Sequence, residues 1–251
     1  SRPRGAVTPQ NFRIVETELS EIGPGELLVR NHYLSLDPYM RGRMEESKSY
    51  AESQKLGETM IGGTVGVVEA SNNPGFAAGD TVLGMFGWQE YGLSDGTGLM
   101  KVDTRAVPMS AYLGAVGMPG VTAWYGLNRI CRPKAGETVL VSAASGAVGS
   151  VVGQLAKHAG CRAIGIAGGQ EKCDYVVSEL GFDACIDHRR HGDVKSMARA
   201  LREAAPNGID GLFENVGGVC LDGALACMNP FGRIALCGLI AGYNGQDIAI
   251  H

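Results

Sequence analysis

Short apolar runs separated by turn residues make up the first half of the chain. The runs ELLVRNHYLSL, MIGGTVGVVEA and GDTVLGMFGWQEY lie between residues 26 and 103, and none of them keeps a helical period for long. Turn residues at 23–25, 72–75 and 94–96 bound these runs at spacings that are typical of antiparallel strands. The pattern predicts a β-rich first domain, built as a small barrel or sandwich.

The pattern changes after Gly120, where apolar strands begin to alternate with helices. VTAWYGLNRI (121–130) has the apolar spacing of a helix. The strands predicted after it are Thr138–Ser142, Arg162–Ala167, Ala184–Asp187, Ile209–Glu214 and Arg233–Gly238. Strands joined by crossover helices are typical of a doubly wound parallel sheet. The sequence therefore predicts an α/β protein with one domain over 1–120 and a second over 121–251.

Composition and charge narrow the classes of function. The 251 residues carry a formal net charge of −4 and no run of Lys or Arg, so neither nucleic acid nor an anionic membrane is the expected partner. The seven cysteines are odd in number and form no CxxC pair, which suits a reduced cytoplasmic protein better than a disulfide framework. No apolar run is long enough for a membrane helix. A small-molecule ligand is the expectation.

Residues 143–149, AASGAVG, lie between a predicted strand and a predicted helix and come close to the GxGxxG pattern. In such turns a pyrophosphate binds to backbone N–H groups and to the positive end of the helix dipole. Gly146 allows a close approach and Gly149 lets the helix pack on the strand, whereas Ala144 stands at the tight-turn position. The alternative is a tightly packed crossover without a ligand, and the strand–turn–helix context favours a dinucleotide.

The end of the second predicted strand bears on the choice between NAD and NADP. It runs into Gly168 and Gly169 without the carboxylate that binds a ribose 2′-hydroxyl. Lys172 can pair with a 2′-phosphate, and His188 is a second candidate donor. In the alternative interpretation Lys172 is a solvated helix residue and Glu171 is the acid, although Glu171 also suits the first turn of a helix. The residues favour NADP.

Metal ligands are scarce in the first domain, which holds one histidine, His32, and no cysteine. Zinc chemistry of the dehydrogenase kind is therefore not expected. Without a metal, hydride is expected to go to an electrophilic carbon such as the β-carbon of an enone, while hydrogen-bond donors stabilise the carbonyl oxygen. Tyr50, in a polar loop, and Tyr243, in a Gly-rich loop after the fifth strand, are the candidate donors. Ordinary packing is the alternative for each, and for Tyr50 it fits equally well.

Six segments together resemble one family. They are YLSLDPYMRGRM (33–44), GMPGVTAWYGL (117–127), AASGAVGSVVGQLAK (143–157), AGGQEKC (167–173), ENVGG (214–218) and CGLIAGYN (237–244). They look like the zinc-independent medium-chain reductases of the leukotriene B4 12-hydroxydehydrogenase/prostaglandin reductase family, and most like its bacterial NADPH-dependent curcumin reductases. The resemblance implies a GroES-like first domain, a Rossmann second domain, and NADPH-dependent reduction of the carbon–carbon double bond of enones and enals.

The resemblance also implies roles for individual residues. It places Lys172 on the 2′-phosphate, Asn215 near the cofactor and the loop 237–243 beside the nicotinamide, and it matches Tyr50 to a substrate-loop tyrosine. His188 stands where prostaglandin reductases carry a phosphate-binding tyrosine. The cofactor-binding set that it implies is Met118, Thr122, Gly146, Ala147, Val148, Gly149, Gly169, Lys172, His188, Asn215, Cys237, Gly238, Leu239 and Tyr243.

Proteins of this family run further at the C-terminus than this sequence does. The second domain is therefore expected to be incomplete here, and a homodimer paired through a sixth strand is expected of the intact protein. Two alternative functions stay open beside the enone reductase. One is a quinone oxidoreductase of the same superfamily, and the other is a dinucleotide-binding protein without turnover.

Overall fold

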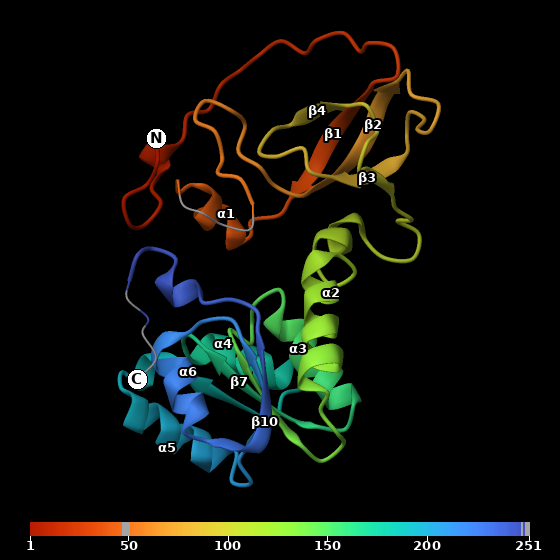
Figure 1. Ribbon diagram of the computed structural model, residues 1–251. Helices are drawn as coiled ribbons and strands as arrows, with labels where there is room; N and C mark the ends of the chain where they lie inside the picture. Colours follow the sequence, from red (N-terminus) through yellow and green to blue (C-terminus); the bar gives the residue numbers. More distant parts are fainter. Residues whose placement is uncertain (47–50, 247, 249–251) are drawn as a thin grey trace. The chain divides into compact units, whose positions relative to one another are not determined.

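The structure is a computed structural model that describes residues 1–46, 51–246 and 248. The chain forms two compact units, Ser1–Gly117 and Met118–His251 (Figure 1). Over the described residues, no helix is long and apolar enough to cross a membrane.

An antiparallel sheet forms the centre of the first unit. Leu27, Val29, Val68 and Val82 build its buried core, because alternate residues of a strand face the same side. Its strands are β1 (Leu27–Leu34), β2 (Thr64–Ser71), β3 (Thr81–Gly84), β4 (Tyr91–Ser94) and β5 (Met100–Lys101), in the order β4-β1-β2-β3-β5. The β-rich prediction is confirmed, but among the described residues the strands pair in one open sheet and not in a sandwich or closed barrel. Its last strand, β5, has only two residues and pairs with β3.

Short helical segments complete this unit. The helix α1 (Tyr39–Arg43) lies within the YMRGRM motif, and its residue Met40 packs with Met44 and Met60 in a small apolar cluster. Two 3-10 turns, Pro9–Asn11 and Met109–Leu113, are the other helical pieces among the described residues.

The second unit is built on a parallel sheet. Its strands are β6 (Thr138–Ser142), β7 (Arg162–Ala167), β8 (Ala184–Asp187), β9 (Ile209–Glu214) and β10 (Met228–Leu236), in the order β10-β9-β6-β7-β8. The first four have the predicted bounds. The fifth begins at Met228 and not at Arg233, because a register shift interrupts its pairing with β9 and Phe231 has a left-handed backbone (φ 64°). That irregularity breaks the apolar pattern before Arg233.

Helices cover both faces of this sheet (Figure 1). Val139 and Val141 of β6 face a core with residues of α2 and α3, whereas Leu140 faces a core with residues of α5 and α6. The helices are α2 (Met118–Tyr125), α3 (Gly149–His158), α4 (Gln170–Ser178), α5 (Val194–Ala204) and α6 (Gly218–Leu225). The doubly wound prediction is confirmed.

Two helices differ from the sequence expectation. The first starts at Met118, and after Tyr125 it continues as a π-helix over Gly126–Cys131. Gly126 lies against the ring of Phe213, where a Cβ would clash. The second, α6, has the sequence GVCLDGAL and was not predicted, because its two glycines weaken the helical signal.

Candidate functional site

The strand order places a topological switch point at the carboxyl ends of β6 and β9. These two strands are neighbours, and the chain continues from β6 to β7 on one side and from β9 to β10 on the other. Ligands of open α/β sheets bind at such a point. The AASGAVG turn follows β6, and the ENVGG motif begins on the last residue of β9, so both predicted motifs meet there.

The turn after β6 has the geometry that was expected of a phosphate-binding turn. Gly146 N donates to the carbonyl of Ala143 (2.9 Å), and a Cβ at Gly149 would clash with that same carbonyl. Helix α3 starts at Gly149 without a side-chain cap or an acidic residue in its first turn, so its N-terminal amides suit an anion. Ala143, with φ 49°, takes the left-handed conformation. Ala144, which was expected at the tight turn, is buried and donates to the carbonyl of Ile166.

A hydrogen-bonded cluster joins the ends of β6 and β9. The hydroxyl of Ser142 donates to Oε1 of Glu214 (3.0 Å) and accepts from the backbone N–H of Asn215 (2.7 Å). The side-chain amide of Asn215 donates to the carbonyl of Ser142 (2.8 Å). Burial raises the pKa of Glu214, which is fully enclosed. Ser142 and Glu214 were not singled out from the sequence, although Ser142 directly precedes the turn 143–149 and Glu214 is the first residue of the ENVGG motif.

The loop after β10 lies against this cluster. The carbonyl of Glu214 accepts from the backbone N–H groups of Cys237 (2.9 Å) and Gly238 (3.1 Å), and that of Asn215 accepts from Ile240 (3.1 Å). A Cβ on Gly238 would lie 3.1 Å from the hydroxyl of the half-buried Tyr243. Five sequence-predicted residues, Asn215, Cys237, Gly238, Leu239 and Tyr243, are thus brought together.

Cationic side chains gather at the end of β7. A Cβ on Gly168 would lie 2.8 Å from Nε2 of His188, and one on Gly169 would lie 3.2 Å from Nη1 of Arg189. Both glycines directly follow β7, the second predicted strand. Gly169 takes a left-handed backbone (φ 100°) immediately before α4, and α4 carries the exposed Lys172. Arg189 was not singled out from the sequence, and its place in the run HRRH after β8 was the available signal.

The structure also brings a carboxylate to this place, although none follows β7 in the sequence. Asp187, the last residue of β8, accepts from the backbone N–H groups of Gly169 (2.7 Å) and Arg189 (3.1 Å). These hydrogen bonds, the one from Gly169 foremost, lower the pKa of Asp187, and Arg190 pairs with its other oxygen at 3.6 Å. Its charge is therefore balanced locally, while Lys172, His188 and Arg189 remain exposed.

Five predicted residues remain: Met118, Thr122, Ala147, Val148 and Tyr50. Thr122 and Cys237 line an apolar pocket of about 370 Å³ beside α2 and β10. Met118, one turn before Thr122, is exposed, and its sulfur lies 3.6 Å from the Thr122 hydroxyl. Ala147 and Val148 belong to the turn before α3. Tyr50 lies outside the described residues.

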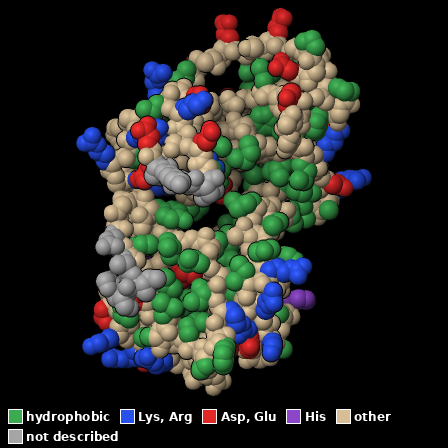
Figure 2. Space-filling model, in the orientation of Figure 1, with side chains coloured by type: hydrophobic (Ala, Val, Ile, Leu, Met, Phe, Trp, Pro, Cys, Tyr) green, Lys and Arg blue, Asp and Glu red, His purple; other side chains and the backbone are tan. Residues whose placement is uncertain are grey.

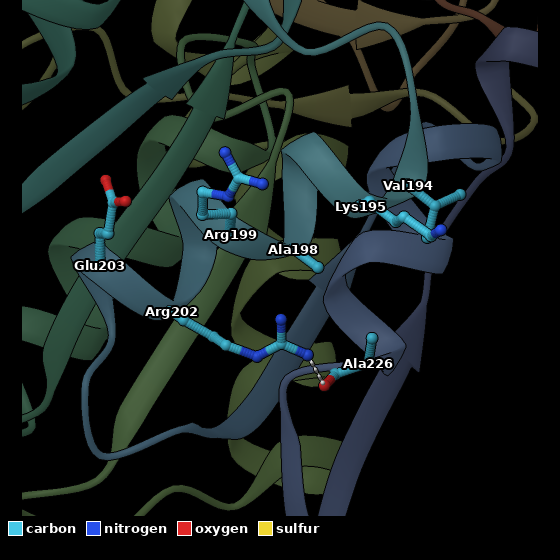
Figure 3. A pocket seen from close by; sticks show the side chains of 7 residues that line it. All are labelled: Val194, Lys195, Ala198, Arg199, Arg202, Glu203 and Ala226. Atoms are coloured by element: carbon cyan, nitrogen blue, oxygen red, sulfur yellow. Dashed lines mark hydrogen bonds between the residues drawn. The ribbon is translucent and has the colours of Figure 1, made fainter.

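A second pocket, of about 500 Å³, lies on the outer side of α5 and holds none of the predicted residues (Figure 3). Lys195, Arg199 and Arg202 line it, and Arg202 donates to the carbonyl of Ala226 (3.2 Å). Figure 2 shows the basic side chains that gather over α5 at the lower left. Because this pocket lies away from the strand ends that carry the predicted motifs, we do not assign it to the site.

Comparisons with known proteins agree with this fold. Residues 1–102 match a family model described as the N-terminal domain of oxidoreductase, and residues 147–250 match one described as zinc-binding dehydrogenase. The NADPH-dependent curcumin reductase of Escherichia coli is 48% identical over 99% of this chain and 71% of that protein. The NADP(+)-dependent 2-alkenal reductase of Nicotiana tabacum is 48% identical over 88% of this chain and 64% of that protein.

A solved structure gives the same result. The crystal structure of CurA from Vibrio vulnificus in complex with NADPH has a TM-score of 0.92 at 50% identity, over 99% of this chain and 73% of that one. The chain therefore belongs to the medium-chain dehydrogenase/reductase superfamily, in the family of these NADPH-dependent reductases.

The donor set does not fit a catalytic zinc, in spite of the name of the second family model. The first unit has a single histidine, His32, which is exposed on β1, and no cysteine. Over the described ranges, no three His, Cys, Asp or Glu side chains are grouped as metal ligands would be.

Proposed function

We propose that the protein reduces the carbon–carbon double bond of α,β-unsaturated ketones and aldehydes with NADPH. The observation that carries this is the joint site at the ends of β6 and β9, where Asn215 is hydrogen-bonded to Ser142, directly before the pyrophosphate-type turn, and the loop 237–243 is hydrogen-bonded to residues 214–216. The relatives named for NADPH and 2-alkenal, which is an unsaturated aldehyde, support the same chemistry.

The residues present fit NADPH. The uncapped N-terminus of α3 and Gly146 would hold the pyrophosphate, and Lys172, His188 and Arg189 would hold the 2′-phosphate. When bound, the cofactor would supply hydride to the β-carbon of the substrate, and a proton from solvent at the α-carbon would complete the reduction. The protein then has to stabilise the negative charge that develops on the carbonyl oxygen, and we assign that to the hydroxyl of Tyr243 as a neutral hydrogen-bond donor. Tyr50 is proposed to act from the substrate loop.

A panel of acceptors tests the reaction. We expect the purified protein to oxidise NADPH with 2-alkenals and enones, and to leave their saturated counterparts as products identified by mass spectrometry. Simple quinones serve as the comparison. Faster turnover with quinones than with every enone would favour a quinone oxidoreductase, and NADPH binding without oxidation by any acceptor would favour a protein without turnover.

Tyr243→Phe tests the proposed donor. Removal of one hydrogen bond to the developing charge is expected to lower kcat by roughly 100-fold. The dissociation constant for NADPH is expected to change by less than about twofold, because the phenyl ring keeps its packing. Stopped-flow turnover and fluorescence titration measure the two quantities. Tyr175→Phe, on the exposed surface of α4, is the matched control and should leave both unchanged. Unchanged turnover in Tyr243→Phe would remove Tyr243 from the mechanism.

We also infer a cytoplasmic homodimer. The seven free cysteines support a reducing compartment. β10 is an end strand of the parallel sheet, and Phe231, Ile234 and Leu236 on it are exposed, which supports a covering by further protein. Light scattering on the purified protein tests the dimer, and a monomeric mass at every concentration would contradict it.

A further inference from the structure

Glu214 is a buried acid that does not itself take part in the proposed reduction. It is the last residue of β9 and has no exposed surface. Its Oε1 accepts from three donors: the hydroxyl of Ser142 (3.0 Å) and the backbone N–H groups of Val216 (2.6 Å) and Gly217 (2.7 Å). Its Oε2 is also buried and has no hydrogen-bond partner among the described residues. Because enclosing such a group is costly, an apolar residue would be expected here if packing alone mattered.

The three donors belong to segments that must be placed accurately. Val216 and Gly217 directly follow Asn215, and Gly217 has a left-handed backbone (φ 84°) that leads into α6. Hydrogen bonds from two successive amides to a single oxygen fix the direction of this turn. The carboxyl group of Glu214 therefore sets the path of the chain immediately after Asn215.

Ser142 extends this control to Asn215 itself. Its hydroxyl has one proton, and donation to Glu214 leaves the oxygen free to accept from the backbone N–H of Asn215 (2.7 Å). The carbonyl of Ser142 accepts from the side-chain amide of the same asparagine (2.8 Å). Asn215 is thus held at two points by a serine whose hydroxyl Glu214 orients.

The loop 237–243, which carries Tyr243, is hydrogen-bonded to the same end of β9. The backbone carbonyl of Glu214 accepts from Cys237 and Gly238, and the carbonyls of Asn215 and Val216 accept from Ile240 (3.1 Å) and Ala241 (2.9 Å). A change in direction of the chain at 215–217 would therefore move the loop 237–243 as well.

We propose that Glu214 is a positioning residue, which acts through Ser142 and the amides of Val216 and Gly217 to hold Asn215 and the loop 237–243 in place for the nicotinamide end of the cofactor. This inference rests on the proposed function and on the family resemblance, which implies that Asn215 lies near the cofactor and the loop 237–243 beside the nicotinamide. It assigns Glu214 no contact with substrate or cofactor.

Glu214→Ala and Glu214→Gln separate positioning from packing. Glutamine keeps an oxygen that can accept the same three hydrogen bonds, whereas alanine leaves three donors without an acceptor. We expect Glu214→Ala to lower kcat about 100-fold, the size of effect that a small misplacement of reacting groups produces, with KM for the enone within about threefold. Glu214→Gln is expected to restore most of that kcat. A folded alanine variant with wild-type kcat, or an equal loss of kcat in both variants, would overturn the proposal.

Amide hydrogen exchange gives a readout that needs no turnover. In the wild type the amides of Asn215, Val216 and Gly217 are expected to be protected, and NADPH is expected to slow their exchange further. Both forms of protection should be lost in Glu214→Ala and kept in Glu214→Gln. If the alanine variant does not fold, Ser142→Ala takes its place, with faster exchange at Asn215 and a roughly tenfold lower kcat expected. Wild-type exchange at Asn215 in that variant would overturn the proposal.

The two proposals can fail separately. If the wild type reduces no enone, the proposed function is wrong. The exchange of residues 215–217 with NADPH alone then still shows whether Glu214 controls their order, and exchange that does not depend on Glu214 would overturn the positioning role even in an active reductase.

Discussion

Alanine replacement of Lys172 and Arg189 together is expected to weaken NADPH binding by about 100-fold or more and to leave NADH binding within about threefold. Hydrogen bonds to charged groups contribute about 1.5–3 kcal/mol each, and about 1.4 kcal/mol corresponds to a factor of ten in affinity. Lys172 lies on α4, and Arg189 lies next to Gly169 at the start of that helix. A 2′-phosphate in this place would be the only part of the cofactor that distinguishes the two dinucleotides.

Fluorescence titration of both dinucleotides with each single variant and the double variant measures this effect. Lys195→Ala, which removes a lysine from the pocket on α5, is the control and should change neither affinity. The loss should shrink at high ionic strength, because exposed charges are screened by salt. An equal loss for NADPH and NADH would refute the assignment of the 2′-phosphate.

Gly149→Ala is expected to destabilise the second unit by about 2–4 kcal/mol and to abolish measurable NADPH binding. The new methyl group would clash with the backbone of Ala143 and Ala144, which cannot move aside as a flexible side chain would. Overpacking of a tight site costs about 1–3 kcal/mol, and a contact with rigid backbone lies at or above the top of this range. The shift needed to relieve the clash would also displace the turn that approaches the pyrophosphate.

Chemical denaturation and NADPH titration measure the two parts of this prediction. Gly192→Ala is the matched control: it lies in the same unit, a Cβ there meets no atom within 4 Å, and it should change stability by no more than about 0.5 kcal/mol. Gly146→Ala should lie between the two, because its Cβ would be 3.1 Å from the carbonyl of Ala143. A Gly149→Ala protein with wild-type stability and affinity would show that the turn adapts, and that its glycine is not required.

The architecture of the second unit could be predicted because its signals are local. β6 is a continuous apolar run, β7 to β9 are short segments rich in apolar residues, and the bounds of all four follow from the sequence. The start of β10 was misplaced because the irregular backbone around Phe231 interrupts the apolar pattern before Arg233. The helix α6 was missed for a similar reason, since the burial of Leu221 and Ala224 stabilises a segment that has low helix propensity.

The candidate site could be predicted only where its residues form a motif. The turn 143–149 and the ENVGG motif are each a continuous stretch of sequence, so their glycines and Asn215 could be named. Ser142 and Glu214 are 72 positions apart and meet only because β6 and β9 are neighbours in the sheet. Asp187 reaches Gly169 in the same way, because β7 pairs with β8. Contacts across a parallel sheet depend on strand order, which spacing in the sequence does not encode.

The hydrogen-bonded clusters at the strand ends also bear on how this protein can evolve. The cluster after β7 and β8 contains Asp187 and Arg189, the cluster between β6 and β9 contains Ser142 and Glu214, and no hydrogen bond described above joins the two. Mutations that change preference for the phosphorylated dinucleotide can therefore accumulate without rebuilding the groups that hold the reactive end. Such independence would let an evolving protein change its preference from one dinucleotide to the other by a few substitutions, without altering the hydrogen bonds of Ser142 and Glu214.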